Sequence, residues 1–216
     1  MSEVHQNIST KLPKNTPQIR TADVVVVGGG IAGKACALGL AQLGLQTIQI
    51  APDIGQTIVT PQGDQWGQRI YAFSPSTQKL LAKLQVWDAI DHSRLQPVRD
   101  MRIFGDRGEK HDQLHLSAFE AGTPQLAWIG ESNVIEHTLD QASRFQNKLE
   151  RISDAVKNIQ VDWDGVSLHL KNGSVVYAQL VIAADGANSP IRSELGISTK
   201  EESYSQSAVV ANWICS

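Results

Sequence analysis

The chain has 216 residues, of which 41% are hydrophobic and 19% charged, and its formal net charge is −3. That length supports one good hydrophobic core, or one and a half domains, and the composition is ordinary for a globular protein. A slightly acidic chain gives no electrostatic reason to expect nucleic-acid binding. Two cysteines, Cys36 and Cys215, are too few for a disulfide framework and fit a reducing compartment.

Residues 1–21 are polar, include Pro13 and Pro17, and lack the apolar core of a signal peptide. We therefore expect a flexible tail at the amino terminus. No stretch of the chain approaches the ~18 consecutive apolar residues that a membrane span requires.

A run of valines followed by spaced glycines is the most informative motif. Residues 23–27 predict a buried strand, and the pattern G-x-G-x-x-G then opens a predicted helix over 31–43. The first glycine permits a tight turn, the second lets the backbone approach a pyrophosphate, and the third lets helix and strand pack closely. Free N–H groups at the start of the helix attract phosphate. The candidate dinucleotide-binding residues here are Gly28, Gly30, Ile31, Ala32 and Gly33.

The remaining elements follow from hydrophobic periodicity and turn residues. Residues 46–50 complete a βαβ unit, and residues 53–67 read as a long loop. Ser74 and Pro75 open a helix, and Asp164-Gly165 and Asn172-Gly173 are typical hairpin turns. Helices are expected over 74–84, 86–90 and 132–145. Strands are expected over 101–104, 113–116, 126–129, 159–163, 166–170, 175–177, 180–184 and 207–214.

Four segments together resemble the FAD-dependent aromatic hydroxylases, the group that includes para-hydroxybenzoate hydroxylase, and within it the ubiquinone-biosynthesis branch. They are the glycine motif 28–33, the run Gln68–Ser74, the run Trp128–Ile135 and the run Leu180–Arg192. They occur in the family's order and span almost the whole chain from Asp23 onward. Nothing after Asp185-Gly186 resembles the family's second FAD motif, so the chain resembles only the N-terminal half of such an enzyme.

The resemblance implies an α/β fold, a Rossmann-like FAD-binding domain of the GR2 type with part of an antiparallel substrate-side sheet. The implied division is a tail over 1–21, an FAD-binding domain over 22–95 and 120–200, and a partial substrate-domain sheet over 96–119 and 201–216.

The resemblance also implies cofactor-binding roles for residues beyond the glycines. Arg69 carries a forked, permanently charged donor suited to phosphate, although a plain surface arginine is the alternative. Asp185 and Gly186 are expected near the cofactor pyrophosphate in a motif also linked to NAD(P)H; a helix-capping role is the alternative for Asp185. Glu131 matches a position on the adenosine side of FAD, and a first-turn helix acid is its alternative. Arg192 belongs to the same motif as Asp185, and a structural role explains it as well as a cofactor-binding role does.

One expected residue is missing. Dinucleotide folds place a ribose-binding acid at the end of the second strand, roughly 20 residues after the glycines, and Ala51 stands there. Either Asp53, two residues later and beyond Pro52, takes that role, or backbone groups hold the ribose.

The implied activity is an FAD-dependent monooxygenase that uses NAD(P)H or another reductant and O2. A flavin C4a-hydroperoxide would hydroxylate a phenolic ring, here a polyprenylated phenol of ubiquinone biosynthesis. The flavin carries the hard chemistry, so we name no catalytic residue. The implied location is the cytoplasm, with peripheral contact to the inner membrane and partner subunits of a quinone-biosynthesis complex left open.

Rival functions have less support. A truncated, non-catalytic FAD- or ADP-binding module and a prenyl-lipid flavin reductase are the two alternatives. His111 and His115 stand four residues apart, but the surrounding alternation favours a strand over a metal-binding helix, and we expect no metal site. No G-x-S-x-G motif supports a serine nucleophile.

Overall fold

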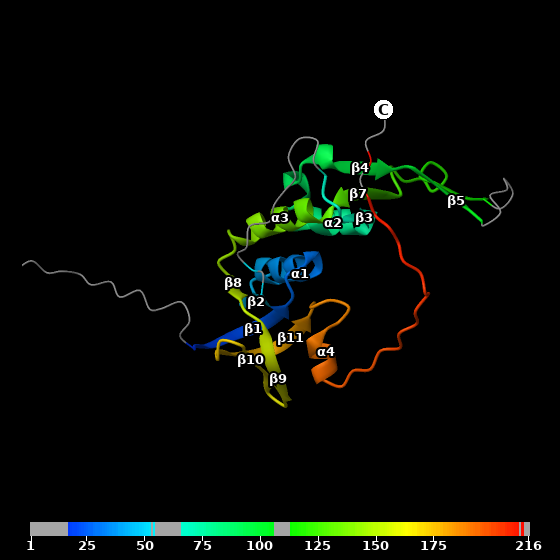
Figure 1. The fold of residues 1–216 in the computed structure, drawn as a ribbon. Coiled ribbons are helices and arrows are strands. Elements are labelled where there is room, and N and C mark those ends of the chain that lie inside the picture. Colours follow the sequence, from blue (N-terminus) through cyan, green and yellow to red (C-terminus); the bar gives the residue numbers. More distant parts are fainter. Residues whose placement is uncertain (1–16, 53, 55–65, 106–112, 212, 214–216) are drawn as a thin grey trace, which may run out of the picture.

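The computed structural model describes residues 17–52, 54, 66–105, 113–211 and 213. Within these ranges the chain forms a six-stranded mixed sheet, a three-stranded sheet and a two-stranded hairpin (Figure 1). The large sheet has the order β8-β2-β1-β11-β10-β9. Its strands are β1 (Ile19–Val27), β2 (Thr47–Ala51), β8 (Leu149–Ser153), β9 (Val156–Asp162), β10 (Gly165–Leu170) and β11 (Val175–Ala183).

The first four strands across this sheet, from β8 to β11, run parallel, and β10 and β9 continue it antiparallel. Helices cover both faces, which explains the unbroken valine run of β1. Val25 and Val27 pack in the core on one face with Ile191, and Val26 packs in the core on the other with Ala37. A central strand of a covered parallel sheet needs such residues on both sides.

Helix α1 (Ile31–Gln42) lies between the sheet and helix α3 (Ser132–Ser143), as Figure 1 shows. The short helix α4 (Pro190–Glu194) lies on the opposite face, where Ile191 joins the core. No helix of the described residues is long and apolar enough to cross a membrane.

A second core joins α1 and α3 to the smaller sheet, with Leu38, Phe73, Trp87 and Ile135 among its buried residues. This sheet consists of β3 (Ile70–Phe73), β7 (Ala127–Glu131) and β4 (Leu95–Val98), in that order. Helix α2 (Pro75–Lys83) and two 3-10 turns, η1 (Trp87–Ala89) and η2 (His92–Arg94), complete this part.

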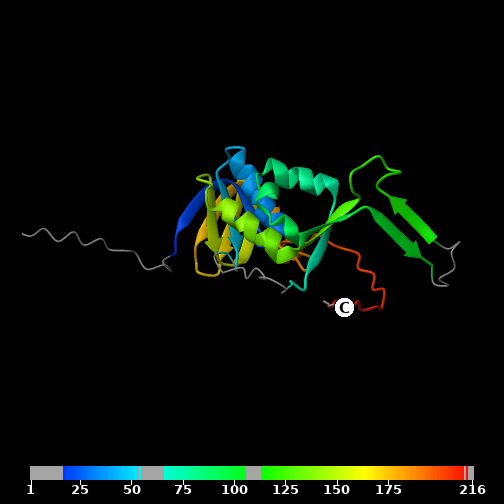
Figure 2. The same ribbon diagram turned by 90° about the horizontal axis from the view of Figure 1, so that it is seen from above.

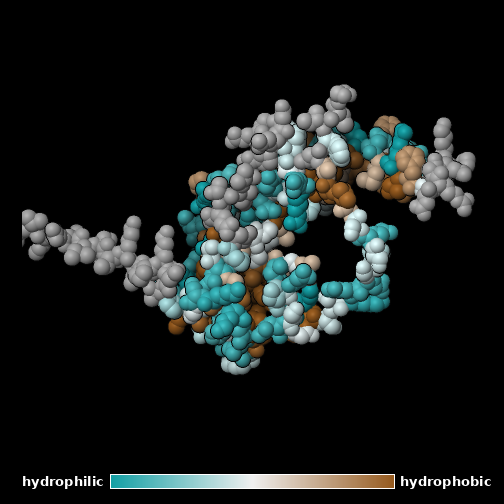
Figure 3. Space-filling model, in the orientation of Figure 1, coloured by the Kyte–Doolittle hydropathy of each residue, from teal (hydrophilic) through white to brown (hydrophobic). Residues whose placement is uncertain are grey.

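The hairpin of β5 (Asp100–Phe104) and β6 (Gln113–Ser117) projects away from the rest of the molecule (Figure 2). Met101 pairs with Leu116 and Ile103 with Leu114, so one face of the hairpin is apolar. These four side chains are 40 to 55% exposed. Brown, hydrophobic side chains accordingly gather at this side of the molecule in Figure 3.

Most expected elements are confirmed, with boundary shifts and four differences. β1 begins at Ile19, inside the segment 1–21 expected to be a tail, because it pairs with β11 along its length. For the same reason, residues 175–183 form one strand where two were expected. The strands β3, β4 and β8 and the short helix α4 were not expected from the sequence. The strand expected over 207–214 is wrong for its described residues, 207–211 and 213, which lie outside any sheet.

Candidate functional site

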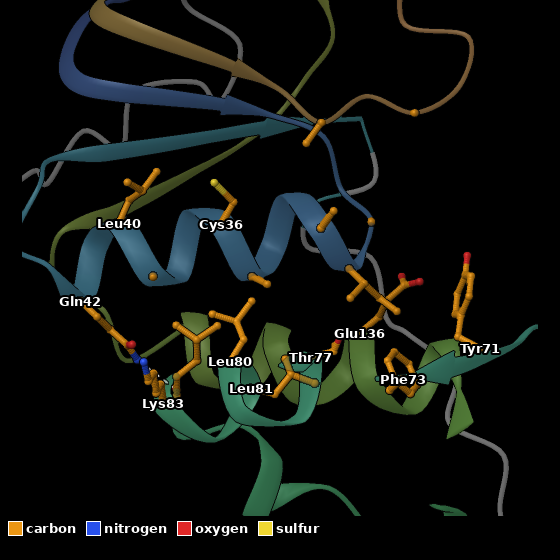
Figure 4. Close-up of a pocket in the computed structure, with 18 of the residues that line it drawn as sticks. Cys36, Leu40, Gln42, Tyr71, Phe73, Thr77, Leu80, Leu81, Lys83 and Glu136 are labelled. Carbon is orange, nitrogen blue, oxygen red and sulfur yellow. Dashed lines mark hydrogen bonds between the residues drawn. The ribbon is translucent and has the colours of Figure 1, made fainter. Parts of the chain in front are cut away.

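A cavity of about 1080 Å³ runs along α1 and brings together much of the predicted site (Figure 4). Residues from α1, β3, α2 and the end of β11 line it. Among the predicted site residues, Gly30, Ile31, Ala32, Arg69 and Gly186 are in its wall. Residues that are almost 160 positions apart therefore contribute to one site.

The parallel register of the sheet explains this meeting. β1 ends at Val27 and its neighbour β11 ends at Ala183, so both following turns leave the same edge. The Ala184 N–H group donates to the Val27 carbonyl at 2.7 Å. Ligands of open α/β sheets bind outside such carboxyl ends.

The three motif glycines have different structural requirements. Gly28 has φ +143°, and a Cβ added there would lie 2.1 Å from the Ala184 carbonyl oxygen. A Cβ at Gly33 would lie 2.4 Å from the Gly28 oxygen, whereas one at Gly30 meets nothing within 4 Å. The first and third glycines thus permit close backbone packing, and the second faces space that a ligand can enter.

Gln49 on β2 is a residue of this turn that sequence reasoning missed. Its buried Nε2 donates to the Gly28 carbonyl at 2.8 Å, and the Gly28 N–H group donates to the Ile50 carbonyl at 2.9 Å. Both polar groups of the Gly28 backbone are therefore held by β2. A polar residue inside a buried strand was the available signal, because a buried amide needs a partner.

The amino terminus of α1 is open to an anion. Gly30 is its N-cap, no side chain caps it, and the first turn contains no acid. The first helical hydrogen bond joins the Lys34 N–H group to the Gly30 carbonyl at 3.0 Å, so the N–H groups of Ile31, Ala32 and Gly33 precede the helical ladder. Such groups and the helix dipole together suit a phosphate.

Arg69 supplies a cation at this cavity. Its side chain is exposed, and its guanidinium carbon lies 5.3 Å from the centre of the Tyr71 ring. Its backbone is fixed, because its carbonyl accepts the Ser132 N–H group at 2.9 Å. A fixed backbone with an exposed guanidinium suits an oxyanion ligand better than a buried ion pair does.

Glu131 lies elsewhere, in a cluster with Trp66, Gly67 and Arg94, here called the Glu131 cluster. The Arg94 Nη2 group donates to Glu131 Oε2 at 3.0 Å, and Nε lies 2.7 Å from Oε1. The Gly67 N–H group also donates to this carboxylate, and the Arg94 guanidinium lies 4.1 Å from the Trp66 ring centre. Glu131 is 2% exposed and is not in the wall of the cavity.

The Glu131 cluster instead anchors the segment that leads into Arg69. A Cβ at Gly67 would lie 2.8 Å from Asn133 Oδ1 and 2.9 Å from Glu131 Oε2, so the segment packs closely on β7 and the start of α3. The Gly67–Glu131 hydrogen bond joins residues 64 positions apart, and local sequence patterns gave no indication that Arg94 would join them.

Asp185 and Arg192 organise the turn that carries Gly186. Asp185 Oδ2 accepts the Ile191 N–H group at 3.3 Å, and Ser189 Oγ accepts the Arg192 N–H group at 3.0 Å. The Arg192 guanidinium donates to the Ala187 carbonyl at 2.5 Å. Asp185 has the helix-capping contact weighed as its alternative, and Gly186, with φ +96°, is the member of the pair in the cavity wall.

Two further predictions concern the ribose and metal ions. Ala51 is confirmed at the end of β2 and is 2% exposed, whereas Asp53 lies outside the described residues. His115 lies in β6, as the alternation predicts, and its Nε2 is 2.9 Å from Asp100 Oδ1. The described part of the chain contains no group of three or more potential metal ligands.

Comparison with known proteins identifies the family to which this chain belongs. Residues 21–214 match the family model described as FAD binding domain. The chain therefore belongs to the FAD-binding domain family, and it is related to FAD-dependent monooxygenases, among them ubiquinone-biosynthesis hydroxylases. The uncapped α1 terminus, the space at Gly30 and the exposed Arg69 fit the diphosphate of that cofactor.

Two curated relatives illustrate the match. The chain is 33% identical over 197 residues to 3-demethoxyubiquinol 3-hydroxylase of Escherichia coli (strain K12), covering 89% of this chain and 48% of that protein. It is 29% identical over 192 residues to ubiquinone hydroxylase UbiL of Rhodospirillum rubrum, covering 88% and 43%. The chain thus spans less than half the length of these relatives.

Solved structures show the same fold. p-Nitrophenol 4-monooxygenase PnpA from Pseudomonas putida DLL-E4 superposes with a TM-score of 0.62 at 23% identity, covering 83% of this chain and 44% of that one. The flavin-dependent monooxygenase PieE gives 0.65 at 20% identity, covering 85% and 33%. The α/β fold with its mixed sheet and small antiparallel sheets is therefore that of flavin monooxygenases.

Proposed function

We propose that this chain is the FAD-binding part of a monooxygenase that hydroxylates the ring of a polyprenylated phenol in ubiquinone biosynthesis. The observation that most strongly supports this proposal is the site at the sheet edge, where the α1 terminus, Arg69 and Gly186 border one cavity. The substrate class is supported by the names of the relatives, one of which is a 3-demethoxyubiquinol 3-hydroxylase.

The described residues would hold the cofactor at its diphosphate. The N–H groups of Ile31 and Ala32 would donate to one phosphate, and Arg69 would neutralise charge on the diphosphate. Gln49 and Gly28 would keep the turn in the shape that this requires. When bound, FAD supplies the redox chemistry with O2 and a reductant. NAD(P)H as that reductant, peripheral membrane contact and partner subunits of a quinone-biosynthesis complex belong to the proposal.

The first test is whether the 216-residue chain binds FAD. We expect isothermal titration to detect FAD and also ADP, because the described contacts lie at the diphosphate. Arg69→Ala is expected to weaken both about tenfold, the equivalent of 1.4 kcal/mol. Arg99→Ala, at an exposed arginine outside the cavity wall, is the matched control and should bind as the parent does.

The second test is product analysis. A purified protein that retains FAD is incubated with NADH or NADPH, O2 and a demethoxyubiquinol analogue with a short prenyl chain, and the product is examined for an added oxygen atom. Oxygen insertion supports the proposal. A saturated prenyl chain without inserted oxygen would assign the protein to the prenyl-lipid reductases. FAD binding without any product would leave a cofactor-binding module and contradict autonomous hydroxylation.

A further inference from the structure

The wall of the cavity contains a tyrosine beside Arg69. Arg69, Tyr71 and Phe73 all line the cavity, whereas Ile70 is not part of its wall. Alternate residues of a strand point to the same side, so these three side chains form a row along one face of β3. Figure 4 shows the Tyr71 and Phe73 rings on this strand, toward the end of the cavity where α1 begins.

One end of this row is anchored in the hydrophobic core. Phe73 is 5% exposed and belongs to the core that joins α1 and α3 to the smaller sheet. Its ring centre lies 6.1 Å from that of Tyr71, and the two ring planes are tilted by 60°. Aromatic pairs at this separation attract each other in tilted arrangements. The main chain of Tyr71 is also fixed, because it pairs with Gly130 of β7.

The other end of the row is the Arg69 guanidinium. Its carbon atom lies over the Tyr71 ring, 5.3 Å from the ring centre. A cation within about 6 Å of an aromatic face is attracted by the electrons of the ring. No carboxylate of the described residues forms an ion pair with Arg69. In this part of the chain, the Tyr71 ring is therefore the charge-attracting contact of the guanidinium.

An aromatic ring holds a guanidinium in a different way from a carboxylate. A carboxylate accepts the N–H groups and cancels the positive charge, whereas a ring face attracts the cation and leaves the forked N–H donors unused. Arg69 therefore keeps its charge and its donors for an oxyanion while the ring restricts its side chain. A side chain that is ordered in advance loses less conformational entropy when a ligand binds.

We propose that Tyr71 is a positioning residue for the cofactor diphosphate: its ring holds the Arg69 guanidinium at the cavity before the ligand binds. Tyr71 acts through Arg69, and its hydroxyl group is not required. This inference rests on the proposed function, because that function gives Arg69 a diphosphate to bind.

Isothermal titration of the 216-residue chain with ADP measures the effect. Tyr71→Leu should raise the dissociation constant about three- to fivefold, as expected for the loss of an exposed cation–π contact. Tyr71→Phe keeps the ring and should bind ADP within about 1.5-fold of the parent. Tyr177→Leu is the matched control and should bind as the parent does, because Tyr177 is 48% exposed in β11 and lies outside the cavity wall.

A double-mutant cycle tests the action through Arg69. In an Arg69→Ala background, Tyr71→Leu should change the dissociation constant by less than about 1.5-fold, because the group that Tyr71 positions is gone. An undiminished loss in that background would overturn the proposal, since Tyr71 would then act on the nucleotide or on the fold by itself. A loss in Tyr71→Phe as large as that in Tyr71→Leu would also overturn it, by assigning the effect to the hydroxyl group.

Nuclear magnetic resonance of the unliganded chain tests the ring contact without any nucleotide. With isotope-labelled arginine, the side-chain Nε signal that disappears in Arg69→Ala belongs to Arg69. The ring current of Tyr71 displaces this signal, so Tyr71→Leu should move it and Tyr71→Phe should leave it near its parent position. The other arginine signals should stay in place, which shows that the fold is intact.

The two measurements separate the two proposals. An Arg69 signal that Tyr71→Leu does not move would overturn the positioning role, whether or not the chain binds ADP. A signal that moves as expected in a chain that does not bind ADP would support the ring contact and contradict the proposed function instead.

Discussion

The Glu131 cluster gives the sharpest test of what a residue in this family motif does. Resemblance assigns Glu131 to the adenosine side of FAD, whereas the structure shows its carboxylate paired with Arg94 and the Gly67 N–H group. The side chains of Glu131 and Arg94 are 2% and 9% exposed, so their ion pair is shielded from water. Glu131→Gln keeps the shape of the side chain but removes the negative charge that faces the Arg94 guanidinium.

Removing one partner of a buried pair costs about 3–5 kcal/mol, against a total stability of about 5–15 kcal/mol for a domain. We expect Glu131→Gln and Arg94→Met each to lose roughly 3 kcal/mol in urea unfolding followed by circular dichroism. The double variant should lose less than the sum of the two single losses, because both substitutions remove the same ion pair. Arg144→Met is the control: its side chain is 56% exposed, and Asp140 keeps its ion pair with Arg151, so the loss should be at most about 1 kcal/mol.

Two results would contradict this structural role of the Glu131–Arg94 pair. If Glu131→Gln unfolds at the same urea concentration as the parent while its affinity for ADP falls, Glu131 contacts the nucleotide and its buried pairing does not stabilise the fold. If the two single losses simply add in the double variant, the ionic pair is not the unit that stabilises this segment.

Three further measurements test the glycine turn and the burial of Cys36. Gln49→Met keeps a similar side-chain volume but removes the hydrogen bond to the Gly28 carbonyl. We expect the affinity for ADP, measured by isothermal titration, to fall about tenfold. An unchanged affinity would contradict the role given to the Gln49 amide. Gly33→Ala places a Cβ 2.4 Å from a backbone oxygen and should abolish FAD retention on a desalting column, whereas Gly39→Ala, whose Cβ meets only a leucine methyl at 3.3 Å, should retain FAD. Burial raises the pKa of the Cys36 thiol, so the folded chain holds less thiolate at a given pH than the unfolded chain. The pH midpoint of Cys36 alkylation should therefore lie higher in the folded chain than in the unfolded chain. Equal midpoints would contradict the burial of the Cys36 thiol.

The sequence is most informative where the chemistry is local. The valines before Gly28, the Ser74-Pro75 helix start and the Gly165 and Gly173 turns are confirmed because a few neighbouring residues determine each of them. The Ser74 Oγ atom accepts the Thr77 N–H group at 3.2 Å, as the cap predicts. The proximity of the Gly28 and Gly186 turns could also be predicted from the sequence, because both turns come after parallel strands.

The rest depends on contacts between distant residues. β3 and β4 are short strands whose residues carry no period-2 signal, and they form because both pair with β7. Arg94 is an ordinary arginine in the sequence until η2 brings it to Glu131. The expected strand over 207–214 shows the converse: its alternation favours a strand, but strand structure requires a paired neighbour, and its described residues have none.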